Sequence, residues 1–485
     1  MIGRAARLLG PVIGLLLLAG CATAPGTGRT IFTGGMSEQQ EAALGFQEHA
    51  KIVEQFGGAY EDPALQAYIS SLGNLLVATS ETPDRSFTFT VLNSPIVNAF
   101  ALPGGYVYIT RGLLTLADNE AEVAGVLAHE IGHVTARHAA ERYGDAMTAT
   151  ALNLGVAILL GGQAAQATSG LSQLVLRGFS REQEYEADLL GVRYLSRTGH
   201  DTGAMASFLR RLQAHSRLEA TLAGKPGAAD EFSLLQTHPR TVDRIERAIA
   251  EAAEKPVANP EIARDVYLAQ IDGMLYGDSP EEGVIRGRDF LHPDLGFAFS
   301  VPPDFTLFNG RRSVLARGPQ GSAILFDRAG KASRASMTSY ISREWARDVR
   351  LDGLEAITVN GLEAATAQTR LTMRGGTFDV RLVAIRFDNE TIYRFVFITP
   401  PALTSALSLG LRETTYSFRR LTPQEAASIQ PLRLRVYRVR AGDTQSAIAE
   451  RLPFESYRLG RFQVLNGLQP GEALQAGQTV KIVVE

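Results

Sequence analysis

The sequence predicts a multidomain α+β protein, and three observations support this fold class. First, 485 residues are more than one compact core usually holds. Second, helical periodicity dominates up to about residue 280, interrupted by one short β-rich stretch, whereas alternating strand patterns take over afterwards. Third, the last fifty or so residues read strand–helix–helix–strand. The composition is globular, and a net charge of −3 gives no basic excess, which argues against a nucleic-acid partner.

Residues 1–20 are typical of a secretory signal peptide. Arg4 and Arg7 precede an apolar run from Leu8 to Ala19, which is too short to span a bilayer and fits a signal h-region. The sequence therefore predicts export.

The end of this segment, Leu18-Ala-Gly-Cys21, resembles a bacterial lipobox. That resemblance implies lipid attachment at Cys21, the single cysteine of the chain, and Ala22 resembles the outer-membrane sorting class. A chance cysteine in an uncleaved anchor is the alternative. Residues 21–36, rich in Gly, Thr and Pro, are expected to form a flexible tether.

The most informative stretch is His129-Glu-Ile-Gly-His133. No proline occurs from Ala121 to Ala140, and apolar residues recur at helical spacing, at Val123, Val126, Leu127 and Val134. This spacing predicts an amphipathic helix with one buried stripe. Residues four apart lie one turn above each other, so His129 and His133 present two imidazoles to one point. Glu130 lies one step round, within reach of a water held at a metal there. The alternative is a pair of ordinary histidines with a chance glutamate between them.

A second predicted helix, residues 180–191, supplies carboxylates. Catalytic zinc usually takes three protein ligands and leaves its fourth position for water. Two histidines therefore need one further ligand, which a carboxylate from this helix could provide. The candidates are Glu182, Glu184, Glu186 and Asp188.

These residues resemble the gluzincin metallopeptidases of peptidase family M48. The resemblance implies one zinc ion per chain, a third ligand in Glu184, a general base in Glu130, and a carboxylate in Asp188 that orients a ligand histidine. The helix geometry agrees, because Glu184 and Asp188 share a face and Glu186 points roughly 200° away. The resembling elements are His129–His133, Glu184-x-Glu-Ala-Asp188 and Thr237-His-Pro-Arg-Thr-Val-Asp-Arg-Ile245.

A rival zinc pattern is excluded. Metzincins place a third histidine six residues after the second, with a glycine between them. Here His138 follows His133 by five residues and no glycine intervenes. We expect His138 to be a structural neighbour or a helix-end residue.

The family resemblance implies further cleft residues. His238 and Arg244 are expected near the cleft as an oxyanion donor, a substrate contact or an occasional fourth zinc ligand, and the sequence leaves these roles open. A helix-capping or core histidine is the alternative for His238. Asn98 and Ala99 begin one strand of a hairpin around Pro103-Gly-Gly, and this strand is expected to bind extended substrate through its backbone. An ordinary core hairpin is the alternative.

The segment from Ala146 to Leu176 is apolar, but an apolar run of about 10–14 residues is short of a membrane span. We expect a buried or cleft-covering helical hairpin, with contact at a membrane interface as the alternative.

The C-terminal half shows a different pattern. Strands and two helices after about residue 285 predict an α+β domain of unknown role that weakly resembles the PsbP-like fold; a scaffold or substrate-presenting surface is expected. Residues 432–485 resemble a LysM module, with Asp443-Thr444 as a helix start. Gln445 and Ala476 depart from that pattern, so glycan binding and a packing role are both open.

These signals divide the chain into five segments. They are a signal peptide (1–20), a tether (21–36), an M48-like domain (37–280), an α+β domain (285–425) and a LysM-like module (432–485).

Together these features predict a lipid-anchored zinc endopeptidase of the bacterial cell envelope, at the outer membrane facing the periplasm. By family analogy its substrates are misfolded or unassembled envelope proteins, and peptidoglycan is a second expected partner. The competing hypothesis is a non-catalytic cell-wall-binding or assembly factor with a structural zinc site. Glu130 favours catalysis, because a structural site needs ligands but no base.

Overall fold

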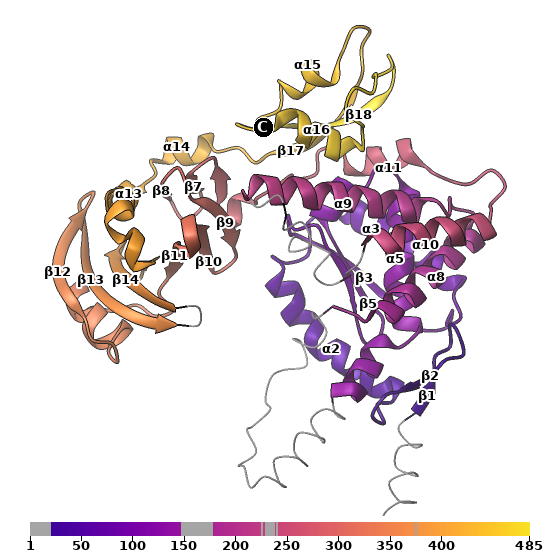
Figure 1. The fold of residues 1–485 in the computed structure, drawn as a ribbon, viewed down its shortest axis with the longest axis horizontal. Coiled ribbons are helices and arrows are strands. Elements are labelled where there is room, and N and C mark those ends of the chain that lie inside the picture. Colours follow the sequence, from indigo (N-terminus) through magenta and orange to yellow (C-terminus); the bar gives the residue numbers. More distant parts are fainter. Residues whose placement is uncertain (1–20, 147–177, 225–226, 228–237, 239–240, 374–375) are drawn as a thin grey trace, which may run out of the picture. The chain divides into compact units, whose positions relative to one another are not determined.

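The computed structural model describes residues 21–146, 178–224, 227, 238, 241–373 and 376–485 (Figure 1). Two compact units are present: the first contains the chain up to Tyr276 together with Arg433–Val484, and the second contains Gly277–Leu432. The predicted signal peptide and nearly all of the apolar segment from Ala146 to Leu176 lie outside the described residues. Among the helices that are described, none combines the length and apolarity that a bilayer crossing requires.

The first unit is mainly helical, as the sequence predicts. The sequence predicts its two leading helices from Ser37 and from Asp62-Pro63, and both begin there. The Ser37 hydroxyl accepts from the Gln40 N–H, and the Asp62 carboxylate accepts from the Ala64 and Leu65 N–H groups. The helices are α2 (Glu38–Gln55), α3 (Pro63–Ala78), α4 (Arg111–Leu116), α5 (Glu120–Thr135), α8 (Arg181–Thr198), α9 (Ala204–Leu222), α10 (Thr241–Glu254) and α11 (Arg264–Ile271).

A three-stranded sheet completes this unit, with strands β3 (Thr88–Leu92), β4 (Ala99–Leu102) and β5 (Tyr106–Thr110) in the order β3-β5-β4. Strand β3 runs parallel to β5, and β4 forms the expected antiparallel hairpin with it. The hairpin turn needs glycine at Gly105, which has φ +90° and lies so close to the Ser86 carbonyl that a Cβ atom would be 2.4 Å from its oxygen. Strand β4 is an edge strand of this sheet.

Helix α5, which carries His129 and His133, is buried on every side rather than along one stripe. Every residue of the helix after Glu120 is buried. The expectation of an amphipathic helix is therefore wrong, because α3, α8, α9 and β4 all pack around it (Figure 1). A helix that is enclosed in this way presents its polar side chains to other protein groups, not to bulk water.

The segment predicted to be a flexible tether, residues 21–36, is ordered instead. It contains a short antiparallel hairpin of β1 (Cys21–Thr23) and β2 (Thr30–Phe32). Ala24 and Ile31 are fully buried, and Arg29 forms ion pairs with side chains of the helical unit. The composition indicated flexibility, but these long-range contacts order the segment.

The C-terminal residues fold as the predicted strand–helix–helix–strand module. Its elements are β17 (Arg433–Arg438), α15 (Gln445–Ala449), α16 (Arg458–Asn466) and β18 (Thr479–Val484). Thr444 caps α15, as expected. The module belongs to the first unit, although about 160 residues separate it from α11 in sequence.

The packing of this module centres on Lys481 of β18, which is completely buried. Its ammonium group donates to the carbonyl oxygens of Thr115, Leu116 and Ala117, at distances of 2.8, 3.2 and 2.5 Å. These carbonyls belong to the C-terminal end of α4, where a helix leaves its last acceptors unpaired. The same turn leads through Asp118 into the Asn119 cap of α5. The C-terminal module therefore holds the connection that enters the two-histidine helix.

The second unit combines a seven-stranded and a four-stranded antiparallel sheet, ordered β12-β13-β14-β15-β11-β10-β9 and β16-β8-β7-β6. Phenylalanines dominate its core, among them Phe297, Phe326 and Phe395. The sequence predicts five strands here, at 297–301, 323–326, 363–370, 380–387 and 392–398, and it misses the others. The strands are β6 (Val284–Arg286), β7 (Asp289–His292), β8 (Phe297–Ser300), β9 (Thr306–Gly310), β10 (Ser313–Arg317), β11 (Ala323–Arg328), β12 (Asp352–Val359), β13 (Leu362–Met373), β14 (Gly376–Arg386), β15 (Ile392–Thr399) and β16 (Arg419–Arg420).

The sequence predicts two helices in the second unit, at about 336–348 and 403–415. Where a helix was expected at 336–348, the chain forms α12 (Met337–Ser339) followed by a π-helical turn, Tyr340–Trp345. Helix α13 (Thr404–Ser417) matches its prediction, and α14 (Pro423–Ser428) ends the unit.

Replacing Lys481 by Met should loosen the join between the C-terminal module and α4. Three buried carbonyls lose their donor, and we expect a local loss of about 3 kcal/mol, or roughly a hundredfold faster hydrogen exchange across α4 and β18. Lys51→Met, on a lysine whose side chain is 70% exposed, is the control and should change stability by less than about 0.5 kcal/mol. Equal exchange in the two variants would contradict the inference.

Candidate metal centre

Two neighbouring helices bring the candidate ligands together. On α5, the Nε2 atoms of His129 and His133 lie 3.0 Å apart. On α8, the carboxylate of Glu184 lies 3.7 Å from His129 Nε2 and 3.5 Å from His133 Nε2. The helices can approach this closely because a Cβ atom on Gly132 would lie 3.1 Å from the Ala187 carbonyl oxygen. All three side chains are buried.

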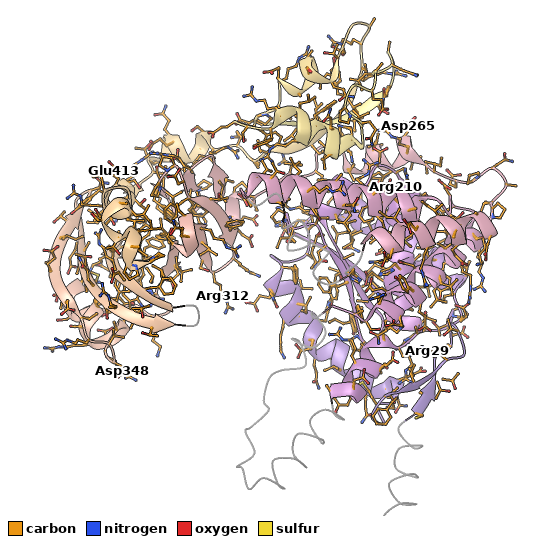
Figure 2. All side chains as sticks on the ribbon, in the orientation of Figure 1. Arg29, Arg210, Asp265, Arg312, Asp348 and Glu413 are labelled. Atoms are coloured by element: carbon orange, nitrogen blue, oxygen red, sulfur yellow. The ribbon has the colours of Figure 1, made fainter. Side chains whose placement is uncertain are left out.

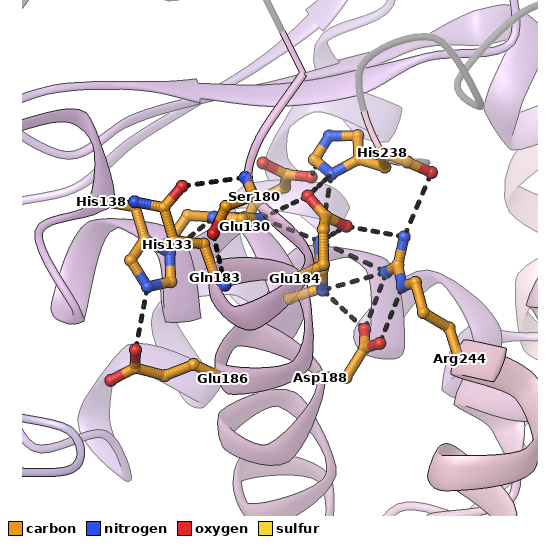
Figure 3. A network of polar contacts seen from close by, with 11 residues as sticks. Glu130, His133, His138, Ser180, Gln183, Glu184, Glu186, Asp188, His238 and Arg244 are labelled. Carbon is orange, nitrogen blue, oxygen red and sulfur yellow. Dashed lines mark hydrogen bonds and ion pairs between the residues drawn. The ribbon is translucent and has the colours of Figure 1, made fainter. Parts of the chain in front are cut away.

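A fourth side chain, His238, joins this group from a distant part of the chain (Figure 3). Its Nδ1 lies 2.9 Å from Glu184 Oε1 and 3.3 Å from His129 Nε2. One ligand atom from each of His129, His133, Glu184 and His238 falls within 4.8 Å of the others. The sequence left three roles open for His238, and the structure places it where a fourth ligand would lie.

The donor set fits a single zinc ion. Zinc–nitrogen and zinc–oxygen bonds of about 2.0–2.1 Å in a tetrahedron put neighbouring ligand atoms about 3.3 Å apart, which is close to the distances observed here. Imidazole nitrogens and a carboxylate are the ligand types that zinc prefers. In addition, Glu130 Oε2 and His238 Nε2 are buried without a hydrogen-bond partner in the described part of the chain.

The electrostatics point the same way. Three buried carboxylates, on Glu130, Glu184 and Asp188, face one buried guanidinium, on Arg244. With neutral histidines, two negative charges stay unbalanced, and a divalent cation supplies that charge. Burial lowers the pKa of His238, but Glu184 and Glu130 raise it by more, so the net shift is upward. Burial also raises the pKa of Glu130. The upward shift of the His238 pKa reflects the surplus of negative charge in this site.

Asp188 and Arg244 fix the orientation of the candidate ligands His129 and Glu184. Asp188 Oδ1 lies 2.9 Å from His129 Nδ1, which leaves the Nε2 atom of that ring for a metal. Arg244 donates to both oxygens of Asp188, at 2.7 and 2.8 Å, and its Nη1 lies 2.7 Å from Glu184 Oε2 (Figure 3). Burial opposes the charge of Asp188, but Arg244 lowers the pKa of this carboxyl far below its usual value. The guanidinium is therefore engaged by carboxylates.

The predicted substrate-binding residues lie at the edge of the sheet. Asn98 precedes β4, and its backbone carbonyl accepts from the Thr110 N–H at 3.0 Å and from the Thr110 hydroxyl at 2.9 Å. The Ala99 side chain is completely buried. Helix α5 packs against β4, so this strand is a neighbour of the ligand-bearing helix. Cys21, the predicted lipid-attachment residue, is exposed at the start of β1.

The site contains two residues whose part sequence reasoning did not identify. His138 Nδ1 lies 2.8 Å from His133 Nδ1, and His138 Nε2 lies 3.2 Å from Glu186 Oε2. His138 was expected only to be a structural neighbour, and Glu186 was set aside because it points away from Glu184. The five-residue spacing from His133 was a sequence signal for His138. The pairing of His138 with Glu186 could not be read from the sequence, because it depends on how α5 and α8 pack.

The comparison with known protein families decides the identity of this region. Residues 63–252 match the model of peptidase family M48, and residues 437–483 match the LysM domain. Residues 63–252 form a peptidase family M48 domain. It contains the whole His-His-Glu group as well as His238 and Arg244. The C-terminal module is a LysM domain by the same comparison.

Several curated proteins resemble this M48 region. The chain is 35% identical over 219 residues to a putative beta-barrel assembly-enhancing protease of Vibrio cholerae, which covers 43% of each chain. It is 34% identical over 220 residues to the beta-barrel assembly-enhancing protease of Escherichia coli K12, again covering 43% of each chain. The mitochondrial metalloendopeptidase OMA1 of Schizosaccharomyces pombe is 31% identical over 182 residues, 37% of this chain and 51% of that protein. The chain thus spans about half the length of the relatives it matches, or less.

A solved structure of cyanobacterial PsbP from Synechocystis aligns with 30% of this chain and 98% of its own, at 12% identity and a TM-score of 0.23. That score is too low to establish a common fold.

The purified chain should bind one zinc ion. His133→Ala should weaken zinc binding at least about a hundredfold, because the loss of a residue that only hydrogen-bonds a metal ligand already lowers metal affinity about 10–100-fold. Competition with a chromogenic chelator measures the dissociation constant. His292→Gln, on a histidine of the second unit, is the matched control and should bind zinc normally. Equal affinity in both variants would contradict the ligand set.

Proposed function

We propose that this protein is a zinc-dependent endopeptidase. The observation that carries the proposal is the buried His129, His133 and Glu184 group with Glu130 beside it, inside an M48 domain. A zinc ion in this group would act as a Lewis acid on the scissile carbonyl and lower the pKa of water. The remaining chemistry belongs to the side chains of the chain itself.

Glu130 is the proposed general base. Its carboxylate is buried, and Oε2 has no hydrogen-bond partner in the described residues, so this atom is available to take a proton from the attacking water. Burial raises the pKa of Glu130 and thereby strengthens it as a base. After taking the proton, the same carboxyl group can pass it to the leaving amine.

The role proposed for His238 is that of a fourth ligand which competes with water. A catalytic zinc site keeps one position open for the reacting water, whereas four protein ligands close it. Support for this role comes from the Nδ1 atom of His238, which lies 2.9 Å from Glu184 Oε1 and 3.3 Å from His129 Nε2 and could take that position. Peptide hydrolysis then requires His238 to leave the ligand group. Arg244, engaged by Asp188 and Glu184, is better suited to holding ligands than to binding an oxyanion.

The proposed substrates are polypeptides of the bacterial cell envelope. Support comes from the relatives whose printed names describe beta-barrel assembly-enhancing proteases, and from the LysM domain. An extended segment of an unfolded or unassembled envelope protein could pair with the edge strand β4 through the backbone of Ala99. The backbone N–H and carbonyl of the neighbouring Asn98 are engaged by Thr110, so Asn98 would contact the substrate through its side chain. The LysM domain would bring the enzyme to peptidoglycan, and a lipid on Cys21 would keep it at the outer membrane, facing the periplasm.

A Glu130→Gln variant should lose about 10²–10⁴-fold in peptidase activity, because an amide cannot accept the proton. The assay follows cleavage of a reduced, unfolded protein, with zinc content checked in the same samples. Glu182→Gln, an exposed residue of α8, serves as control and should keep full activity. Undiminished cleavage by folded, zinc-loaded Glu130→Gln would favour the competing hypothesis of a non-catalytic wall-binding factor with a structural zinc.

A His238→Ala variant separates the roles that the sequence left open. If His238 competes with water for the fourth position, the variant should retain zinc through the other three ligands and cleave at least as fast as the parent chain. Loss of an oxyanion donor would instead lower kcat by about 10²–10³-fold. Measured kcat and bound zinc in the same preparation therefore decide between the two, and a large fall in kcat would refute the role proposed here.

A further inference from the structure

A hydrogen-bonded chain runs from the ligand His133 to the surface of the first unit. His133 Nδ1 lies 2.8 Å from His138 Nδ1, and His138 Nε2 lies 3.2 Å from Glu186 Oε2. His138 is completely buried, and the Glu186 side chain is 9% exposed. The dashed contact between His138 and Glu186 is visible in Figure 3, on the side of the site opposite Arg244.

The chemistry of these groups sets the direction of each hydrogen bond. A carboxylate only accepts, so the proton of the outer bond lies on His138 Nε2. In a neutral His138 ring, Nδ1 is then an acceptor, and the proton of the inner bond lies on His133 Nδ1. This leaves the Nε2 atom of His133 with a free lone pair, directed toward the ligand group. If His138 donated from both nitrogens, His133 would carry its proton on Nε2 and could not bind a metal there.

The backbone is shaped to make this contact. Helix α5 ends at Thr135, and Arg137 adopts a positive φ of 58°, which is unfavourable for a residue with a side chain. This turn places the His138 ring within hydrogen-bond distance of the His133 ring. Arg137 is held in place by Glu41, at 3.0 Å, and by the Met36 carbonyl oxygen, at 2.8 Å. A strained residue with long-range partners at this point fits a positioning role.

At its surface end, this series of hydrogen bonds reaches the N-terminal hairpin of β1 and β2. Arg29 Nε donates to Glu186 Oε2 at 2.9 Å, and the Thr27 hydroxyl donates to the other oxygen of the same carboxylate. Arg29 also binds Glu141 through both terminal nitrogens, at 2.5 and 2.8 Å. Arg29, labelled in Figure 2, comes from the turn between β1 and β2. The hairpin segment is tied down near this point, because Arg193 donates to the Gly26 carbonyl at 3.0 Å.

We propose that Thr27 and Arg29 of the N-terminal hairpin act through Glu186 and His138 as positioning residues for the metal ligand His133. The hairpin is thus part of the metal centre and not only a connection to the N-terminus. The hairpin, through Glu186 and His138, would orient the His133 ring in the way that Asp188 orients the His129 ring. The difference is that part of the support of His133 comes from a surface segment. The proposal rests on the metal site proposed above, but not on peptidase activity.

The experiment measures zinc affinity in the full chain by competition with a chromogenic chelator, together with the visible absorption spectrum of the cobalt-substituted protein. Glu186→Ala removes the acceptor of His138, and Glu182→Ala makes the same change on the exposed face of the same helix. We expect Glu186→Ala to weaken zinc binding about 10–100-fold and to alter the cobalt spectrum, with Glu182→Ala unchanged. Glu186→Gln, which keeps an acceptor oxygen, should restore most of the affinity.

A second variant keeps the test decisive if Glu186→Ala does not fold. Arg29 is 40% exposed in its side chain, so Arg29→Ala can be made without opening the core, and it should weaken zinc binding by about 3–10-fold. Zinc affinity and cobalt spectra equal to those of the parent chain in folded Glu186→Ala and Arg29→Ala would overturn the proposal, as would an equal loss in Glu182→Ala. A parent chain that binds zinc but cleaves no substrate would refute only the proposed peptidase activity.

Discussion

The structure of the first unit depends on the convergence of buried ligand atoms that repel one another. The Nε2 atoms of His129 and His133 are 3.0 Å apart, with the Glu184 carboxylate on the same side. Lone pairs and negative charge enclosed in this way are unfavourable in a low-dielectric interior unless a cation lies among them. The donor set and its two unbalanced negative charges match a divalent ion. Burial of α5 on every side, the close approach at Gly132 and the ion pairs of Arg244 all serve this arrangement.

Each ligand histidine has its own support, and the two supports differ in kind. For His129 the partner is Asp188, which is neutralised by Arg244 inside the core. For His133 the partner is another histidine, backed by Glu186 and the N-terminal hairpin. Phe179 also stacks on the His133 ring, with centroids 3.9 Å apart. Ring orientation decides whether a nitrogen faces the metal, so these partners are as important to the site as the ligands themselves.

The C-terminal LysM domain contacts the turn that precedes the N-terminus of α5. Lys481 satisfies the last carbonyls of α4, and the following residue, Asp118, pairs with Arg264 at 2.8 Å before the Asn119 cap begins α5. The module packs into the first unit and is not joined to it only by a linker, because Lys481 binds the turn that leads into the ligand-bearing helix.

The sequence alone determined the local features of this protein. The four-residue spacing of His129 and His133 is read directly from helix geometry, as are the shared face of Glu184 and Asp188, the Ser37 and Asp62 caps, and the hairpin turn at Gly104-Gly105. Short-range patterns are enough in these cases, because the backbone of one helix or turn sets the geometry. The α+β class and the strand–helix–helix–strand module followed from the same periodicities.

Tertiary structure decided everything that depends on contacts between distant segments. Only packing shows that His238 lies among the other three ligand candidates, and that Arg244 is occupied by Asp188 and Glu184. Only packing orders residues 21–36, and only the left-handed turn at Arg137 brings His138 under His133. The physical reason is common to these cases: free energy gained by pairing buried charges across the fold outweighs the local preferences that a sequence pattern expresses.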